Sequence, residues 1–307
     1  MEHHTAGDPI NGLKWTRKTT GKISRELHQA GLRVSPKTVG RLLRGLQFSL
    51  RVNHKKVAGR SSPFRNQQFE YITRTRRRFA RQGWPALSID TKKRELVGRF
   101  KNAGTTWEPA PVLVNDHDFR TTADGIAIPW GLYDTQANRG QVFVGTSHDT
   151  PAFAVTALAH WWTGAGRRRY GQTTRLLVLA DCGGSNGYRT RAWKYELQTR
   201  FCDRFGLTVT VCHYPPGTSK WNPIEHRLFS EISKNWAGQP LESYETVLNF
   251  LRTTKTQAGL VVTATLLDGD YPTGIKVSEA QMNHVKLRHH RVLPMWNYTL
   301  VPARSKM

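Results

Sequence analysis

Residues 175–187 read Arg175-Leu176-Leu177-Val178-Leu179-Ala180-Asp181-Cys182-Gly183-Gly184-Ser185-Asn186-Gly187. The apolar run at 175–180 predicts a buried strand that ends at Asp181. Functional side chains gather at the carboxyl ends of strands in open α/β sheets. The glycine-rich loop after Asp181 has little steric bulk, so a phosphate backbone can approach it closely. It is not a P-loop, because no Gly-Lys-Ser/Thr follows.

A second acid follows a second apolar run. Residues 86–89 predict a short strand, and Asp90 comes directly after it. An aspartate is also a common strand terminator, so neither acid alone is specific. Two strand-end acids in one chain favour a shared site at one edge of a sheet.

The rest of the second half alternates strands and helices. We expect strands at 86–89, 96–100, 128–133, 141–145, 175–180 and 207–212, and helices at 151–162, 188–205, 223–236 and 243–257. The loops between the first strands are too short for crossovers, so those strands are expected to be antiparallel. The fold class predicted is α/β, with a mixed sheet and helices on its faces.

A third acid lies in the segment 217–226. Asn222 can cap a helix, Pro223 can begin it, and Glu225 then falls in the first turn. One reading is a capping box, in which Glu225 only returns a hydrogen bond to Asn222. The other is that Glu225 faces Asp90 and Asp181, and that the three carboxylates hold two divalent ions suited to phosphoryl transfer. Asp134 and Asp149 also follow strand-like runs and are further candidates to line the site.

The charge balance indicates a polyanionic partner. The 307 residues include 46 Lys and Arg against 22 Asp and Glu, a net charge of +24. Residues 1–80 hold 18 of the cations and 4 of the acids. A surplus this large repels itself unless nucleic acid or another polyanion binds, although ribosome-binding and lipid-surface proteins share the property.

Several protein classes are disfavoured. The sequence has no apolar run of 18 residues and no apolar stretch at its start, which argues against a membrane span and a signal peptide. Its three cysteines form no CxxC pair, so a disulfide scaffold and a zinc ribbon are not indicated. We therefore expect a reducing, cytoplasmic setting.

The first region, 1–52, predicts a helix-turn-helix. Ile23 and Leu27 share one helical face, and Gly31 can end that helix. Ser35 and Pro36 can begin a second helix. Its apolar side is expected to pack on the first helix and consists of Val39, Leu42 and Leu43. Its polar side would enter the major groove of DNA and consists of Lys37, Thr38, Arg41 and Arg44. A plain helical hairpin with a solvated basic face is the alternative.

Residues 53–83 are predicted to be a basic linker or helix, and 84–307 the α/β domain. In the latter, Lys92, Lys93 and Lys220 flank the three acids and are candidates to hold DNA phosphates. Trp221, beside Asn222, is a candidate to stack on an unpaired base.

Longer motifs resemble a known family. They are Ser88-Ile89-Asp90-Thr91-Lys92-Lys93, Gly183-Gly184-Ser185-Asn186-Gly187-Tyr188-Arg189, Trp221-Asn222-Pro223-Ile224-Glu225-His226-Arg227-Leu228-Phe229 and Trp296-Asn297-Tyr298. Together they resemble the ISAzo-type bacterial insertion-sequence transposases, which are distantly mariner-like. The resemblance extends from about Leu13 to Tyr298. In two respects we expect the chain to depart from the family: Cys182 stands in place of a glycine, and relatives usually carry an additional N-terminal stretch with another DNA-binding helical unit.

The resemblance implies a DDE transposase. It implies an RNase H-like catalytic core preceded by an all-α helix-turn-helix region. Asp90, Asp181 and Glu225 would be the catalytic residues and the ligands of two Mg²⁺ or Mn²⁺ ions. The partners implied are double-stranded DNA, as terminal repeats and as target, and a second copy of the chain on that DNA, in association with the bacterial nucleoid. Two alternatives stay open: a truncated or decayed transposase that only binds DNA, and an RNase H-like nuclease without strand transfer.

Overall fold

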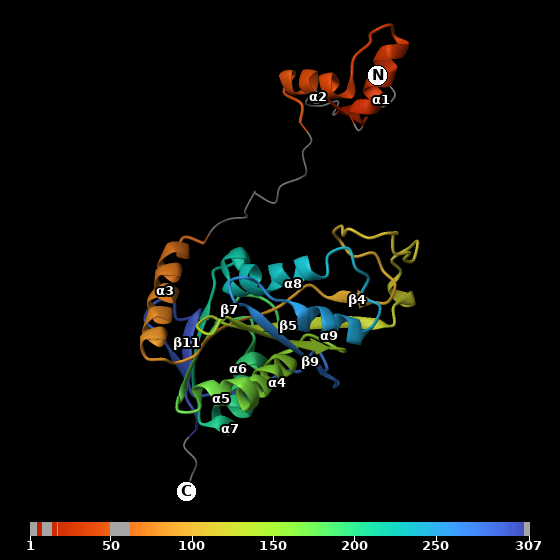
Figure 1. Ribbon diagram of the computed structural model, residues 1–307. Coiled ribbons are helices and arrows are strands. Elements are labelled where there is room, and N and C mark those ends of the chain that lie inside the picture. Colours follow the sequence, from red (N-terminus) through yellow and green to blue (C-terminus); the bar gives the residue numbers. More distant parts are fainter. Residues whose placement is uncertain (1–4, 8–13, 17, 50–61, 304–307) are drawn as a thin grey trace. The chain divides into compact units, whose positions relative to one another are not determined.

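The computed structural model describes residues 5–7, 14–16, 18–49 and 62–303. The chain divides into two units, Met1–Ala58 and Gly59–Met307, and each is described by itself (Figure 1). Residues 50–61, which include the start of the predicted basic linker, lie outside the described residues.

The first unit contains the two predicted helices, α1 (Thr20–Gln29) and α2 (Pro36–Gly45). Ser35 caps α2 as predicted, because its hydroxyl accepts a hydrogen bond from the backbone N–H of Thr38 at 3.2 Å. Ile23 and Val39 are the buried residues of the pair. Leu42, which was expected to pack on α1, is 52% exposed, so that part of the prediction is wrong.

A short antiparallel ladder precedes these helices. It joins β1 (Thr5–Gly7) to β2 (Lys14–Thr16), with Thr5 opposite Thr16. The region is therefore not all-α as expected. Three-residue strands carry too little periodicity to be recognised in sequence.

The second unit is built on a nine-stranded mixed sheet. Its strands are β3 (Ala86–Thr91), β4 (Glu95–Val97), β5 (Gly125–Asp134), β6 (Arg139–Gly145), β7 (Arg175–Ala180), β8 (Thr208–His213), β9 (Val261–Leu267), β10 (Leu287–His289) and β11 (Asn297–Leu300). Their order is β10-β11-β8-β7-β3-β5-β6-β9, with β4 paired to β5.

The pairing directions confirm the predicted fold class. β3, β5 and β6 form an antiparallel meander; β7 then pairs parallel with β3, and β8 pairs parallel with β7. Three antiparallel strands followed by two parallel ones, with helices as crossovers, is the RNase H-like arrangement. The sequence analysis did not predict β9, β10 and β11, which complete the two flanks.

Helices cover both faces of the sheet (Figure 1). The α-helices are α3 (Arg65–Arg81), α4 (Pro151–Trp161), α5 (Arg167–Tyr170), α6 (Arg191–Leu197), α7 (Asp203–Phe205), α8 (Ser230–Asn235), α9 (Tyr244–Thr253) and α10 (Glu279–Met282). Short 3₁₀ turns span Arg120–Thr122 and Ser219–Trp221, and π-helical turns span Trp162–Gly166, Gln198–Cys202 and Glu225–Phe229.

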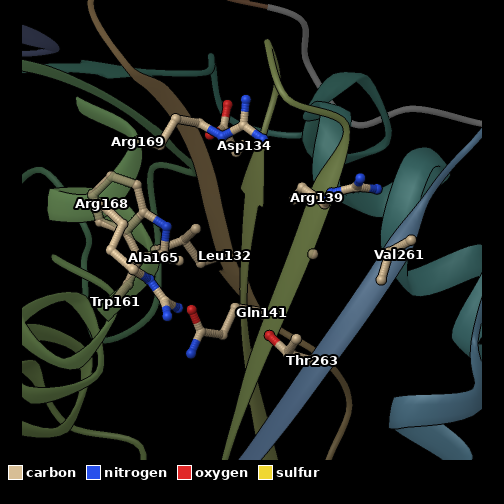
Figure 2. Close-up of a pocket in the computed structure, with 11 residues that line it drawn as sticks. Leu132, Asp134, Arg139, Gln141, Trp161, Ala165, Arg168, Arg169, Val261 and Thr263 are labelled. Carbon is tan, nitrogen blue, oxygen red and sulfur yellow. The ribbon is translucent and has the colours of Figure 1, made fainter. Parts of the chain in front are cut away.

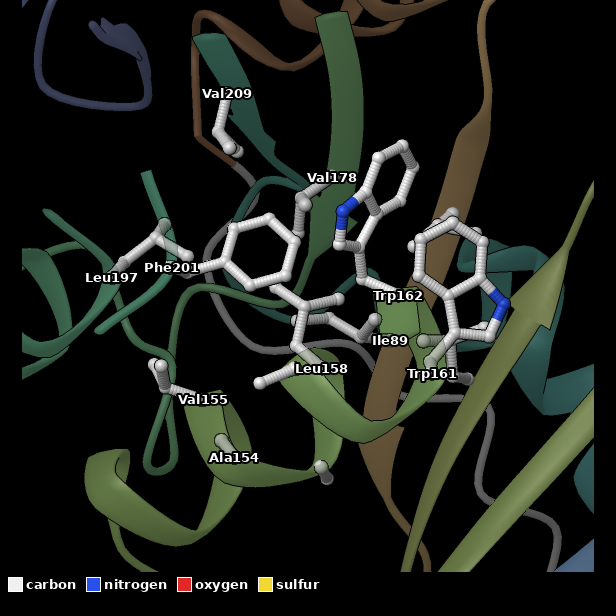
Figure 3. Packing of buried hydrophobic residues seen from close by; sticks show 14 of the residues in the cluster. Ile89, Ala154, Val155, Leu158, Trp161, Trp162, Val178, Leu197, Phe201 and Val209 are labelled. Atoms are coloured by element: carbon white, nitrogen blue, oxygen red, sulfur yellow. The ribbon is translucent and has the colours of Figure 1, made fainter. Parts of the chain in front are cut away.

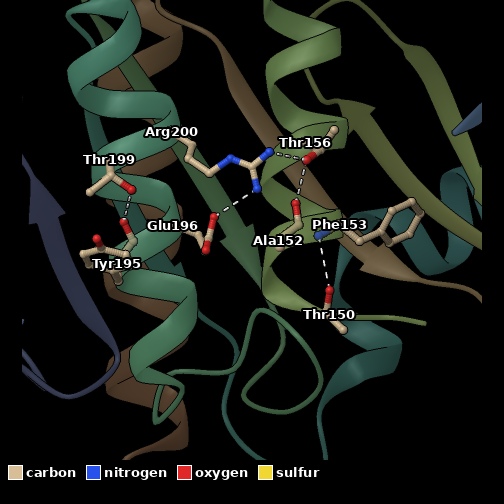
Figure 4. Close-up of polar contacts among 8 residues, drawn as sticks. All are labelled: Thr150, Ala152, Phe153, Thr156, Tyr195, Glu196, Thr199 and Arg200. Atoms are coloured by element: carbon tan, nitrogen blue, oxygen red, sulfur yellow. Dashed lines mark hydrogen bonds and ion pairs between the residues drawn. The ribbon is translucent and has the colours of Figure 1, made fainter. Parts of the chain in front are cut away.

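One face of the sheet is covered by α4 and α6. Figure 3 shows Leu158 of α4 and Phe201 packing toward Ile89 and Val178 of the sheet, all within one buried cluster. Burial of this apolar surface is the main stabilising term for the domain. Figure 4 shows a polar link to α4 from the π-helical turn that follows α6, in which Arg200 donates to the hydroxyl of Thr156 at 3.2 Å.

The opposite face carries two further groups of helices. Residues of the π-helical turn 225–229, α8 and α9 pack on β5, β6 and β9 in a second cluster. Helix α3 packs separately, with Ile72 and Phe79 against Leu177 and Leu179 of β7. The described part of the predicted 53–83 segment is thus largely a helix that belongs to the sheet domain. In the described residues, no helix combines the length and apolarity needed to cross a membrane.

The second face of the sheet is closely packed at Gly131. A Cβ placed on Gly131 would lie 2.5 Å from Phe229 and 3.0 Å from Ile224, because the segment that carries Glu225 lies directly on β5. We expect Gly131→Ala to lower the free energy of unfolding by about 1–3 kcal/mol through overpacking. Gly164→Ala is the control, since a Cβ there meets nothing within 4 Å. Chemical denaturation measures both, and equal stabilities would contradict the packing.

Candidate active site

The sheet register places Asp90 and Asp181 side by side. Ala86, Leu87 and Ser88 of β3 pair with Leu177, Val178 and Leu179 of β7 in parallel register. Continued by two residues, this register sets Asp90 opposite Asp181. Neighbouring strands lie about 4.8 Å apart, so two residues 91 positions apart in the sequence become neighbours.

Both aspartates line one cavity of about 720 Å³, called here the acidic cavity. Its lining comes from the ends of β3 and β7, the loop before α4, the glycine-rich loop and the turn after β8. The lining residues are Asp90, Thr91, Asp149, Asp181, Cys182, Gly183, Gly184, Asn186, Tyr188, Arg189, Pro215, Pro216, Gly217 and Ser219. The glycine-rich loop is part of the lining, as the sequence suggested.

Asn222 ties the segments of the site together. Its side chain is fully buried. The amide nitrogen donates to Oδ1 of Asp181 at 3.1 Å and to the backbone carbonyl of Ile89 at 3.4 Å. Its amide oxygen accepts from the hydroxyl of Ser88 at 2.5 Å. The Ser88 hydroxyl also accepts from the backbone N–H of Ile224 at 3.0 Å, which fixes the start of the next helix on β3.

These bonds decide between the two readings of the 217–226 segment. In a capping box, the backbone N–H of Asn222 would donate a hydrogen bond to the Glu225 carboxylate. That N–H instead donates to the carbonyl of Ser219 at 2.8 Å, and the Asn222 side chain is directed at the strands. The geometry therefore does not support the capping-box interpretation.

Glu225 is carried close to β5 by its helical turn. It opens the π-helical turn Glu225–Phe229, and π-helical turns often occur at functional sites. Ile224 and Phe229 flank Gly131, and Gly131 is the residue that pairs with Asp90 across β3 and β5. The Glu225 turn therefore lies over the strand next to Asp90.

Burial and neighbouring charges shift the pKa of each of the three acids. Burial first, and then the charge of Asp181, raise the pKa of Asp90 to about 8, to which Glu225 and Asp149 also contribute. Burial and the charge of Glu225 raise the pKa of Asp181 to about 6, against the hydrogen bond from Asn222. Burial also raises the pKa of Glu225, while Lys92 and His226 oppose that shift. Half-buried carboxylates that repel each other require a cation to stay ionised together.

The donor set suits a hard divalent cation. Oδ1 of Asp90 accepts from the backbone N–H of Thr91, and Oδ1 of Asp181 accepts from Asn222. Oδ1 of Asp149 is buried and has no hydrogen-bond partner. Carboxylate oxygens are the ligands that Mg²⁺ and Mn²⁺ prefer. In the described residues, no three His, Cys, Asp or Glu side chains already converge as a metal cluster.

The predicted phosphate-binding lysines fall into different environments. Lys92 is largely buried, pairs with Glu95 at 3.0 Å and lies 4.5 Å from the centre of the Trp236 ring. In this position the charge of Lys92 lowers the pKa of Glu225 against the effect of burial. This effect on Glu225 differs from the contact with DNA phosphates that the sequence predicts. Lys93 is exposed and lines a separate hollow. Lys220 is exposed and lies 5.6 Å from the centre of the Trp221 ring.

The basic residues of α2 lie in the first unit. Lys37, Arg41 and Arg44 are exposed, as a DNA-reading face requires. Arg44 donates through Nε to the carbonyl of Gly40, and the Thr38 hydroxyl is 3.0 Å from that of Ser35. Thr38 therefore takes part in capping α2.

The two remaining candidate aspartates, Asp149 and Asp134, lie in different parts of the domain. Asp149 lines the acidic cavity and raises the pKa of Asp90, so it belongs with the predicted acids. Asp134 pairs with Leu87, near the start of β3, and lies at the other end of the strands.

Sequence reasoning missed the roles of Ser88, Asn222 and His213. Nδ1 of His213 is 2.8 Å from the carbonyl of Asp181, and nothing local in the sequence signals that contact.

A mixed RNase H-like sheet with acids at the ends of neighbouring strands defines a class of polynucleotidyl-transfer domains. The family described as "Rhodopirellula transposase DDE domain" matches residues 1–302. The chain belongs to this family, which confirms the resemblance to insertion-sequence transposases.

Among solved structures, the chain is similar to the mariner transposase Mos1. "Mos1 transposase paired-end complex with left transposon end" is 17% identical, with a TM-score of 0.44 over 76% of this chain and 65% of that chain. "Crystal structure of the Mos1 Strand Transfer Complex" has the same identity and coverage and a TM-score of 0.46. The chain thus covers 65% of the length of those Mos1 chains. A comparison with curated proteins finds no match.

Removal of the Asn222 amide tests its role in the site. In Asn222→Ala the Ser88 hydroxyl and the Asp181 carboxylate each lose a buried partner. We expect the free energy of unfolding to fall by about 1–3 kcal/mol, the usual cost of such unsatisfied groups. The control is Asn249→Ala, on the exposed side of α9. Urea denaturation compares the two, and a change no larger than that of the control would contradict the linking role.

Proposed function

We propose that this chain is a metal-dependent DNA transposase, with Asp90, Asp181 and Glu225 as its catalytic residues. It would cleave the phosphodiester bond at the end of a mobile element and join the freed 3′-hydroxyl to target DNA. One observation carries the proposal: Asp90 and Asp181 come from remote segments and line one cavity, and the charges of Asp181 and Glu225 add to burial in raising the pKa of Asp90. Folding brings like charges together in this way mainly where function needs them.

Asp90, Asp181 and Glu225 would hold Mg²⁺ or Mn²⁺, with Asp149 near enough to assist. Two such ions, when bound, activate the attacking oxygen and stabilise the leaving oxygen. Family membership supports this cofactor, and two Mos1 structures carry Mn and Mg in their descriptions.

The protein's own side chains would prepare the site. Thr91 and Asn222 each engage one oxygen of an aspartate, which orients the carboxylates and leaves their second oxygens available. Lys92 would favour the ionised form of Glu225, because its charge opposes the rise in the pKa of that carboxyl that burial causes. Arg189 lines the acidic cavity and would hold a phosphate of the DNA.

Neutral variants of the three acids test the catalytic assignment. We expect Asp90→Asn, Asp181→Asn and Glu225→Gln each to abolish cleavage of labelled element ends in Mg²⁺, because ligands are lost. DNA affinity should be unchanged or higher, since negative charge near phosphate is removed. Asp270→Asn, an exposed acid on the loop after β9, is the control and should cleave like the wild type.

The same assay separates the alternatives. Joined products on a target plasmid would support a transposase, and cleavage without joining would indicate a plain nuclease. DNA binding without cleavage in either Mg²⁺ or Mn²⁺ would indicate a protein that only binds DNA. A Glu225→Gln variant that cleaves at the wild-type rate would remove Glu225 from the catalytic set.

The helix-turn-helix unit is proposed to provide recognition of the element end. We expect Lys37→Gln, Arg41→Gln and Arg44→Gln together to abolish the preference for end DNA over random DNA. They should also weaken binding to both, because charge that contacts phosphate is lost. Gel-shift titration measures both effects. Unchanged end preference in the triple variant would assign recognition elsewhere.

A further inference from the structure

A groove lies at the sheet edge away from the acids. It has a volume of about 540 Å³ and is called here the arginine groove. Figure 2 shows its side chains coming from α5 on one side and from β6 and β9 on the other. The lining residues are Leu132, Asp134, Arg139, Gly140, Gln141, Trp161, Ala165, Arg168, Arg169, Val261 and Thr263.

The cations of the groove are available to a ligand. Arg139, Arg168 and Arg169 are all exposed. In the described part of the chain, none of them forms an ion pair, although eight other pairs are present. Arg139 uses Nη1 to donate to the carbonyl of Gly259 at 3.0 Å, which fixes it at the rim. Three guanidinium groups around one hollow favour phosphate, which they can bind with two hydrogen bonds each.

The one acid among the lining residues, Asp134, is buried and hydrogen-bonded within the protein. Asp134 is only 3% exposed. Its Oδ1 accepts from the backbone N–H groups of Gln136 and Ala137, both at 3.0 Å, and its Oδ2 accepts from the Tyr170 hydroxyl at 2.8 Å. Three donors therefore occupy this carboxylate, which holds α5 against the end of β5.

The wall formed by β6 and β9 is polar and open. β9 alternates between buried and exposed residues, because α9 covers Val262 and Ala264 on the other face. Thr263 is left exposed on the groove side, and Gln141 of β6 lies beside it in register. A hydroxyl and an amide next to the arginines add hydrogen-bond donors for phosphate oxygens.

The groove cannot serve the phosphate that the acids would bind. Asp90 pairs with Gly131, and Asp134 lies three residues further along β5, about 10 Å at the usual rise per residue. The groove therefore extends from Leu132, which pairs with Ile89, toward the amino end of β3 and away from Asp90. Arg175, at the amino end of β7, is not among the lining residues, and its guanidinium carbon lies 5.0 Å from the centre of the Trp84 ring.

We propose that the arginine groove is a second binding site for the phosphate backbone of double-stranded DNA, separate from the acidic cavity. This inference goes beyond the proposed function and rests on it only in taking DNA as the polyanion. The site would bind without regard to base sequence, because arginine contacts to phosphate carry no sequence information. It would hold a part of the DNA away from the cleavage point.

Binding to a random-sequence duplex tests the site in the full-length chain without divalent metal. We expect Arg168→Gln with Arg169→Gln to raise Kd about tenfold near physiological salt, and to reduce the slope of log K against log salt by about 2. Lys276→Gln with Arg288→Gln is the matched control. Both of its residues are exposed and the loss of charge is equal, so its effect should be small. Fluorescence anisotropy over a salt series gives both quantities.

Equal effects of the two variants would overturn the inference, because bulk charge alone would then explain binding. If the wild type binds duplex and the Arg168→Gln, Arg169→Gln variant binds it with the same Kd, this inference is overturned and the proposed function is not. A wild type that does not bind duplex would overturn the proposed function as well. Loss of affinity for single-stranded RNA without loss for duplex would overturn the choice of DNA.

A second measurement needs no variant. Phenylglyoxal modifies accessible arginines, and mass spectrometry can locate the adducts in the wild-type chain. We expect duplex DNA to reduce modification of Arg168 and Arg169 severalfold and to leave Arg288 unchanged. Equal modification with and without DNA would overturn the site, whatever the variants show.

Discussion

The site depends on one buried amide. The side chain of Asn222 joins three segments that are far apart in sequence: it accepts from Ser88 and donates to the Ile89 carbonyl and to Asp181. Since Ser88, Ile89 and Asn222 are all fully buried, the loss of one partner leaves another polar group unsatisfied. The strand of Asp90, the end of the Asp181 strand and the start of the Glu225 helix are thereby held in one arrangement. The donor to Asp181 is neutral, so the carboxylate is oriented without its charge being cancelled.

That arrangement costs electrostatic energy, and the rest of the domain tolerates it. Burial raises the pKa of both Asp90 and Asp181, and a neighbouring acid adds to each shift, chiefly Asp181 for Asp90 and Glu225 for Asp181. The apolar clusters on both faces of the sheet supply the stability that lets such a site persist. Lys92 is placed between Glu95 and Trp236, which fixes one positive charge near Glu225. Buried carboxylates are brought together here because the chemistry proposed for the chain needs them.

The positive charge of the chain is distributed in separate groups. Exposed cations lie on α2 of the first unit, and others line the arginine groove at the edge of the sheet away from the acids. Salt screens exposed charges beyond about 10 Å at 0.1 M, so each group would act mainly on the phosphates close to it. The net charge of +24 thus includes at least two groups of exposed cations, both proposed to bind DNA.

The sequence by itself determined the features that depend on neighbouring residues. The apolar run 175–180, the Ser35-Pro36 start of α2 and the helix at 151–161 were predictable because periodicity and capping are local. The acids at the strand ends could be singled out for the same reason. Only the tertiary structure decided that Asn222 serves the strands instead of a helix cap, that Asp149 joins the acids while Asp134 does not, that Lys92 is buried, and that α5 meets β9 in a groove. Each of these depends on the order of strands in the sheet. That order brings together residues that are more than a hundred positions apart in the sequence, and no local pattern encodes it.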